Sequence, residues 1–326
     1  MKILFVFTGG TIGSTLNGSV MSVDNSKSYK ILDAYDKKFA IDFEYECACP
    51  YLELSENNTG DNLSLLCSCI CENANKGYDG IIVTHGTDTL QYSASAIAYT
   101  LTNPLLPVCV VSASYPIEHA KTNALDNLHS AILVIKNKLG KGVFVPFRNT
   151  KDKIIKLHKA TRLLPSIPYS DEVKSVDNRE YGYFTSDFTF IKNNNFTAQN
   201  SESSPFAPLF SSRSSVLLLH AYPGMNYPVL TENIKYVLLL PYHSGTVDTK
   251  SKSAIEFYNT AKSKDIKVFI SGVKQGDEYE SATLFSSLSI TPIFDLSPIS
   301  AFIKLWLIAS QNKSEDLLFL PLGEDK

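Results

Sequence analysis

A polar turn at residues 84–89, with the sequence Thr-His-Gly-Thr-Asp-Thr, lies between an apolar run and a helical pattern, and this order restricts the fold most strongly. The apolar run covers residues 80–83, and apolar side chains then recur at helical spacing between residues 90 and 101. A short buried strand that enters a polar turn and then an amphipathic helix is the βα unit of a parallel sheet. Ligands of open α/β sheets bind at the carboxyl ends of the strands, so the turn is a candidate binding site.

Two interpretations of this turn are open when its residues are taken alone. Its threonine hydroxyls, carboxylate and imidazole provide the groups of a ligand site. Alternatively, Asp88 caps the helix, because an Asp side chain accepts hydrogen bonds from the free N–H groups of a first turn. In that case His85 is a turn histidine whose hydrogen bonds are satisfied locally.

A second turn of the same kind follows the first residues of the chain. Residues 3–7 are apolar and lead into residues 8–13, with the sequence Thr-Gly-Gly-Thr-Ile-Gly. Paired glycines allow a tight turn and a close approach to a ligand, and successive free N–H groups form an anion-binding nest. Thr11 lies beside these donors. The pattern matches neither the dinucleotide nor the P-loop motif, which disfavours a nucleotide phosphate.

Composition excludes several classes of protein. The 326 residues suffice for one large domain or two ordinary ones, and 44% hydrophobic and 19% charged residues are typical of a globular chain. A formal net charge of −3 predicts no nucleic-acid or anionic-membrane surface. No apolar run approaches the roughly 20 residues that span a bilayer, and we recognise no signal peptide. We therefore expect a cytoplasmic protein.

The cysteines raise the question of a metal site. Three of the six cysteines, Cys67, Cys69 and Cys71, alternate within a probable helix at residues 61–76. Zinc ligands are usually spaced C-x₂₋₄-C with a second pair, and residues two apart on a helix point in different directions. The sequence therefore favours reduced, partly buried thiols over a zinc site.

The rest of the chain predicts an α/β protein with two parts. We assign residues 1–192 to a larger domain, residues 193–215 to a linker rich in Asn, Ser and Pro, and residues 216–326 to a smaller α/β domain. The expected elements are strands at 39–49, 105–111, 216–220, 236–240 and 267–271, a hairpin of 142–147 with 154–157, and a closing helix at 299–309.

Together, the two glycine-containing turns form a pattern that is specific enough to indicate a protein family. Phe-Thr-Gly-Gly-Thr-Ile-Gly at residues 7–13 and Val-Thr-His-Gly-Thr-Asp-Thr at residues 83–89 resemble the bacterial-type L-asparaginase family. Because no signal peptide is recognised, the chain looks like the cytoplasmic, type I branch of this family. The resemblance implies a larger, doubly wound and mostly parallel N-terminal sheet with a smaller flavodoxin-like α/β domain. It also implies sites shared between subunits, and hence a homodimer or homotetramer.

The resemblance also implies roles for individual residues. The implied substrate-binding segments are the loop at residues 51–59, after the strand at 39–49, the turn at 84–89 and the loop after residue 111. The implied catalytic residues are Thr11, Thr87, Asp88, Lys159 and Tyr29. The implied substrate-binding residues are Ser55, Glu56, Gly86, Thr87, Asp88 and Ala113.

The sequence departs from the family pattern at several places, and three of them motivate an alternative function. The expected lid tyrosine position, near residues 18–20, holds no Tyr, and Tyr29 is the nearest one downstream. Tyr115 replaces an Arg in the loop that contains Ala113. In the smaller domain, residues 244–248 replace a Gly-x-Gly-Asn segment. These departures keep open a non-catalytic amino-acid-binding homologue as an alternative.

The implied chemistry is hydrolysis of L-asparagine to L-aspartate and ammonia. A primary amide is a poor electrophile with a poor leaving group, and an ester intermediate divides its hydrolysis into two easier steps. We expect Thr11 to attack first, with Thr87, Asp88 and Lys159 as a nucleophile–base–orienter group. Neither a metal nor an organic cofactor is required. Glutaminase or another amidohydrolase activity of the same fold is the alternative enzyme.

Overall fold

The computed structural model describes residues 1–9, 14–17, 20–23, 30–101, 104–197, 203–276 and 279–325, with 14–17 and 20–23 described by their backbone alone. Two of the predicted catalytic residues, Thr11 and Tyr29, lie outside the described residues.

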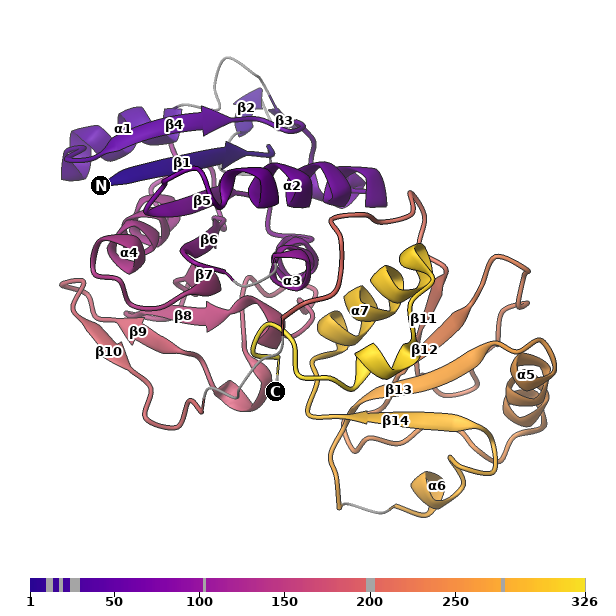
Figure 1. Ribbon diagram of the computed structural model, residues 1–326. Helices are drawn as coiled ribbons and strands as arrows, with labels where there is room; N and C mark the ends of the chain where they lie inside the picture. Colours follow the sequence, from indigo (N-terminus) through magenta and orange to yellow (C-terminus); the bar gives the residue numbers. More distant parts are fainter. Residues whose placement is uncertain are drawn as a thin grey trace.

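An eight-stranded sheet forms the larger part of the molecule (Figure 1). Its central strands are buried along their whole length, which explains their continuous apolar sequences. Five strands run parallel, and the last three extend the sheet as an antiparallel meander. Across the sheet the strands are β10 (Phe190–Lys192), β9 (Gly182–Phe184), β8 (Ile155–Lys159), β7 (Gly142–Phe147), β6 (Pro107–Val111), β5 (Gly80–Thr84), β1 (Lys2–Phe7) and β4 (Glu44–Ala48).

Helices cover both faces of this sheet and bury a hydrophobic core on each. On one face, α1 (Lys30–Phe39) and α4 (Ala124–Lys136) pack over the side chains of alternate strand residues such as Phe5. On the other face, α2 (Gly60–Asn73) and α3 (Leu90–Thr100) pack over the intervening residues. This is the doubly wound arrangement that the family resemblance implies, and it exposes the loops at the strand ends.

A second sheet of four parallel strands forms the smaller part. The helices α5 (Lys252–Ser263) and α6 (Glu280–Thr283) connect its last three strands. α7 (Pro298–Gln311) packs against both this sheet and α3, so it lies between the two sheets, as Figure 1 shows. The strands are, in order, β11 (Val216–His220), β12 (Tyr236–Leu240), β13 (Lys267–Val273) and β14 (Ile290–Phe294).

Short elements complete the fold. A two-stranded antiparallel ribbon follows β1 and consists of β2 (Ser14–Asn17) and β3 (Val20–Val23). In the described part of the chain, four 3₁₀ turns lie in the segments that connect the strands and helices. They are η3 (Ser55–Asn57), η4 (Ala160–Arg162), η5 (Val176–Asn178) and η6 (Glu315–Leu318). Among the described residues, no helix combines the length and the apolarity that crossing a bilayer requires.

The predicted fold class is confirmed, and some element boundaries are corrected. The expected strand at residues 39–49 is shorter, because α1 continues through Phe39 and β4 begins only at Glu44. The prediction missed β14, which contains Pro292, and α5. The boundaries at residues 192 and 215 stay predictions.

Candidate active site

The loops at the carboxyl ends of β1, β5 and β6 are joined by hydrogen bonds. The Thr8 hydroxyl donates to the carbonyl oxygen of Thr84 at 2.8 Å. The His85 N–H donates to the carbonyl oxygen of Val111 at 2.9 Å. Since these residues end three neighbouring parallel strands, the turns that follow them are brought together at one edge of the sheet.

The loop after β4 lies against the end of β1. The Glu53 N–H donates to the carbonyl oxygen of Thr8 at 3.0 Å, and Gly9 forms a bridge with Glu53. Gly9 has a φ of +98°, and a Cβ atom there would lie 2.4 Å from the carbonyl oxygen of Glu53. This position therefore requires glycine for both its conformation and its close approach.

The turn after β5 presents its functional groups at this edge. Thr87 is half-buried, and Asp88 is exposed. Thr89, not Asp88, is the N-cap residue of α3, and the Asp88 carboxylate accepts no hydrogen bond from any residue that the structure describes. The capping interpretation of Asp88 therefore does not apply, and its carboxylate is available to a cationic group.

The predicted carboxylate- and amine-binding loop lies beside this turn. Ser55 is buried and Glu56 is exposed at the start of η3. The Thr89 hydroxyl donates to the carbonyl oxygen of Ser55 at 2.8 Å. This bond brings together the two loops that the resemblance assigns to substrate binding.

His85 is buried behind the turn and does not face solvent. Its Nδ1 atom lies 2.8 Å from the carbonyl oxygen of Gly86, and its Nε2 atom lies 3.4 Å from the side-chain amide nitrogen of Asn58. Burial lowers the pKa of His85 to about 4, so the ring is neutral at pH 7. Sequence reasoning missed Asn58, since one asparagine in a polar loop carries no distinctive signal.

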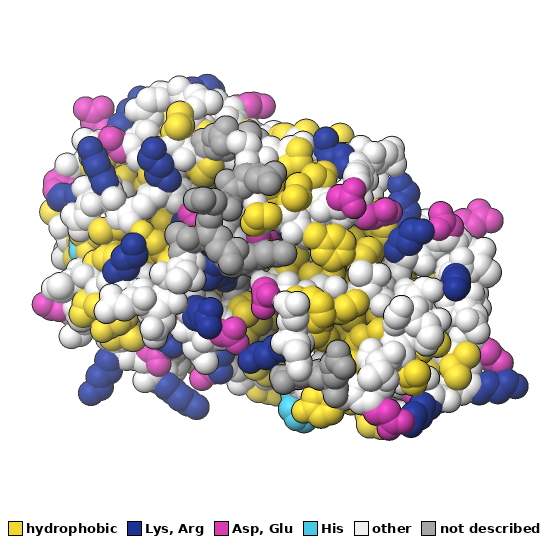
Figure 2. Space-filling model, turned by 60° about the horizontal axis from the view of Figure 1, so that its bottom comes forward, with side chains coloured by type: hydrophobic (Ala, Val, Ile, Leu, Met, Phe, Trp, Pro, Cys, Tyr) yellow, Lys and Arg dark blue, Asp and Glu magenta, His cyan; other side chains and the backbone are white. Residues whose placement is uncertain are grey.

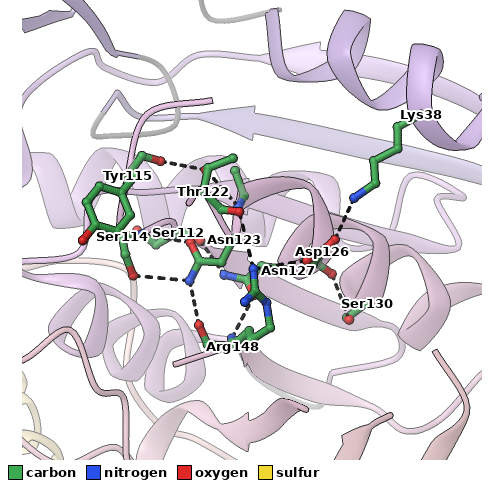
Figure 3. Close-up of polar contacts among 11 residues, drawn as sticks. Lys38, Ser112, Ser114, Tyr115, Thr122, Asn123, Asp126, Asn127, Ser130 and Arg148 are labelled. Atoms are coloured by element: carbon green, nitrogen blue, oxygen red, sulfur yellow. Dashed lines mark hydrogen bonds and ion pairs between the residues drawn. The ribbon is translucent and has the colours of Figure 1, made fainter. Parts of the chain in front are cut away.

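Two buried asparagines hold the loop after β6, which contains Ala113 (Figure 3). The Asn127 side chain donates to the carbonyl oxygen of Ser112 and accepts from the Arg148 N–H, both at 2.9 Å. The Asn123 side chain accepts from the Ser114 N–H at 2.9 Å and donates to the Arg148 carbonyl oxygen at 2.8 Å. The ends of β6 and β7 are thereby tied to the first turn of α4.

Lys159 is the one described catalytic candidate that the structure does not bring to this edge. It pairs with Phe144 in the β7–β8 hairpin, and its ammonium donates to the carbonyl oxygen of Lys141, which precedes β7, at 2.9 Å. A carboxylate oxygen of Glu324 lies 2.9 Å from the same nitrogen. The ammonium therefore lies toward the amino ends of the parallel strands, on the side away from Thr87, so the structure does not bring it to the residue that it was expected to assist.

The cysteines do not form a metal site in the described part of the chain. All six are free thiols, and no group of three or more His, Cys, Asp or Glu residues there is placed to hold a metal ion. Burial raises the pKa of Cys67 to about 12, and that of Cys69 and Cys71 above the ordinary value. These thiols are protonated at pH 7 and pack against α3 and its neighbours.

Charged side chains do not form a continuous field of one sign on the face in Figure 2, where basic and acidic groups are scattered over both parts of the molecule. This distribution agrees with the small net charge of −3. On this face there is no extended basic stripe of the kind that binds a nucleic-acid backbone.

Comparisons with known proteins agree with this architecture. The chain is 25% identical over 250 residues to an L-asparaginase of Thermococcus kodakarensis, covering 74% of this chain and 73% of that one. It is 30% identical over 238 residues to a component of the glutamyl-tRNA(Gln) amidotransferase of Methanosarcina acetivorans, covering 70% of this chain. The match spans about half of the length of such amidotransferase components, from 39% to 65%, and 54% in this case.

The solved structures extend the likeness to the whole fold. The thermostable L-asparaginase from Thermococcus kodakarensis superposes with a TM-score of 0.76 at 20% identity, covering 98% of this chain and 96% of that one. A probable cytoplasmic L-asparaginase from Campylobacter jejuni gives a TM-score of 0.74 at 20% identity, with 98% of each chain covered. The family model "Asparaginase, N-terminal" matches residues 2–187, more than half of the sequence, and the chain therefore belongs to the asparaginase family of amidohydrolases.

Proposed function

We propose that this chain hydrolyses L-asparagine to L-aspartate and ammonia through a threonine ester intermediate. The observation that carries the proposal is the junction of two loops at one sheet edge, where Thr89 donates to the carbonyl oxygen of Ser55. One loop offers the exposed carboxylate of Asp88 and the hydroxyl of Thr87, and the other offers Glu56. Two carboxylates suit the α-ammonium group of an amino acid.

The proposed reaction has two steps. The hydroxyl of Thr11 attacks the side-chain amide carbon, the amide nitrogen leaves as ammonia with the hydroxyl proton, and an aspartyl ester forms. Water then cleaves the ester, which regenerates the hydroxyl and releases aspartate. Backbone N–H groups around residues 11 and 87 hold the developing oxyanion, where one such donor is typically worth ~3 kcal/mol. The chemistry uses no metal and no organic cofactor.

The test is ammonia release from L-asparagine and, in parallel, from L-glutamine. We expect Thr11→Ala and Thr87→Ala to lower kcat by about 10³-fold or more, since each removes a group from the reacting centre. Thr260→Ala, an exposed position on α5, is the matched control and keeps wild-type activity. Equal rates in the wild type and in both site variants rule out the assignment. Faster ammonia release from L-glutamine than from L-asparagine identifies the chain as a glutaminase instead.

A non-catalytic amino-acid-binding protein is the second candidate, and the pairing of Lys159 with Glu324 favours it. Calorimetry with L-aspartate distinguishes the two, because binding without any ammonia release identifies a binding protein. We further propose that the chain is cytoplasmic and forms a homodimer or homotetramer. Light scattering of the purified protein tests the oligomer.

A further inference from the structure

We propose that Asn58 is a positioning residue, which holds the ring of His85 and thereby turns the N–H group of Thr87 toward the substrate. Asn58 follows η3, in the loop after β4, and His85 and Thr87 belong to the turn after β5. The inference rests on the proposed function, because Thr87 belongs to the proposed site. It adds a residue that touches neither the substrate nor the reacting atoms.

The hydrogen bonds of Asn58 fix the orientation of its amide group. Its side-chain nitrogen lies 3.4 Å from the Nε2 atom of His85 and 3.2 Å from the Thr89 hydroxyl. That hydroxyl donates its hydrogen bond to the carbonyl oxygen of Ser55, so it accepts one from the Asn58 side chain. An amide nitrogen has two protons, and here they serve one acceptor each. The reversed amide would place its oxygen against the lone pairs of both partners.

The same bonds fix the protonation of His85. Its Nδ1 atom lies 2.8 Å from the carbonyl oxygen of Gly86, which only accepts, so Nδ1 carries the proton. Its Nε2 atom accepts a hydrogen bond from the Asn58 side chain and therefore carries no proton. The ring is locked as the neutral Nδ1–H tautomer, with 1% of its surface exposed, and it does not act as a proton acceptor in the reaction.

The lock on His85 determines the direction of the next peptide group. The carbonyl oxygen of Gly86 is turned back toward the buried ring. In a planar trans peptide the C=O and N–H groups point in opposite directions, so the Thr87 N–H points away from the ring. Among the residues that the structure describes, this N–H has no hydrogen-bond acceptor. It is therefore a free donor at the edge of the sheet, suited to a developing oxyanion.

Asn58 also joins the two halves of the proposed site, through its backbone N–H and its side-chain amide. The Asn58 N–H donates to the carbonyl oxygen of Ser55 at 3.2 Å, and its side chain bonds to Thr89. One residue thus sets the spacing between the Ser55–Glu56 loop and the Thr87–Asp88 loop. Loss of its side chain displaces the oxyanion donor relative to a substrate held by the other loop.

The first test compares kcat with KM for ammonia release. In Asn58→Leu, which is similar in size but lacks the donors, we expect kcat to fall about 10- to 100-fold, with KM changed less than about threefold. The loss is smaller than for removal of a whole oxyanion donor, because the Thr87 N–H is displaced and not removed. Asn75→Leu, at an exposed position after α2, is the control and keeps both constants. Thermal melting shows that each variant is folded. A folded Asn58→Leu protein with wild-type kcat overturns the proposal.

The second test observes the ring directly and needs no activity. In ¹⁵N-detected NMR of the histidine side chains, the His85 signals are those missing from His85→Gln. We expect the neutral Nδ1–H tautomer from pH 7 down to pH 5 in the wild type. In Asn58→Asp, the new carboxylate only accepts hydrogen bonds, so the facing Nε2 atom must carry a proton. We expect the spectrum of this variant to show Nε2 protonated at pH 7. A wild-type ring protonated on Nε2 contradicts the proposal.

The two tests separate the inference from the proposed function. If the wild type releases no ammonia while the spectra show the expected tautomers, the proposed function fails and the Asn58–His85 lock stands. If ammonia is released but Asn58→Leu and Asn58→Asp alter neither kcat nor the ring, the function stands and the positioning role of Asn58 is wrong.

Discussion

The ammonium of Lys304, in α7, lies 2.7 Å from the carboxylate of Asp325, and both side chains are completely buried. The same carboxylate accepts from the hydroxyl of Tyr99, in α3, at 2.9 Å. The carbonyl oxygens of Leu318 and Leu320 complete the surroundings of the ammonium. An ion pair between the two sheets therefore has its hydrogen bonds satisfied, which is the condition for burying such a pair.

We expect Asp325→Asn to lower the free energy of unfolding by about 3–5 kcal/mol, because it leaves the Lys304 charge buried without a counter-charge. The double variant Lys304→Met with Asp325→Leu regains more than half of that loss, since an apolar pair needs no desolvation of charge. Urea unfolding measures both. Equal stability of Asp325→Asn and the wild type contradicts the burial of this pair.

Lys159→Met is expected to keep kcat within about threefold of the wild type, because the ammonium lies toward the far end of the sheet, paired with Glu324. A catalytic lysine, by contrast, costs about 10³-fold when removed. Stability falls, since Glu324 loses its buried partner. Asp88→Asn, at the proposed site, is the comparison and loses at least about 10²-fold in the same ammonia assay. A comparable loss in Lys159→Met restores the role that the family resemblance implies.

His158, in β8, predicts how stability depends on pH. Burial, together with the nearby Lys156, lowers the pKa of His158 to about 3. Between pH 6.5 and 3 the unfolded chain binds a proton at this residue and the folded chain does not, so stability falls as the pH falls. Each such proton contributes up to about 1.4 kcal/mol per pH unit.

The measurement is urea unfolding between pH 7 and 4. We expect His158→Asn to lose less stability per pH unit than the wild type does, because one proton uptake on unfolding is removed. His243→Asn is the control, since His243 is exposed, and it keeps the wild-type slope. Identical slopes for all three proteins mean that His158 titrates normally in the folded state.

Gly9→Ala tests the close approach of the β1 and β4 loops. A side chain at φ +98° costs about 1–2 kcal/mol, and the added carbon would also clash with the Glu53 carbonyl oxygen at 2.4 Å. Gly77→Ala is the control, because Gly77 also has a positive φ, of +83°, but no atom lies within 4 Å of the added carbon. We expect the first variant to lose at least about 2 kcal/mol more than the second, in urea unfolding.

The elements with a local sequence signal were predictable. The buried parallel strands and the β7–β8 hairpin show in the apolar runs, because a strand covered on both faces has no polar residues to alternate with. β14 was missed, since Thr291 and Pro292 interrupt its apolar run and only its place beside β13 makes it a strand. The start of β4 was missed because α1 and β4 follow each other with few intervening residues.

The site was predictable only in part, for a physical reason. The turn at residues 84–89 is recognisable because its polar groups follow one strand directly. Lys159 was misplaced because a match in sequence does not determine the register of a hairpin, and register alone decides which end of the sheet a side chain reaches. Asn58 acts through partners 27 and 31 residues away, so no local pattern identifies it.

The contact of Tyr99 with Asp325 spans 226 residues of sequence. The strands of the large sheet end at Lys192, so during synthesis this sheet can form while the hydroxyl of Tyr99 still lacks the carboxylate of Asp325 as its acceptor. The interface between α3 and α7 is therefore completed only after residue 325 has been made, and we expect a nascent chain stalled before that residue to be more sensitive to proteases than one that includes it.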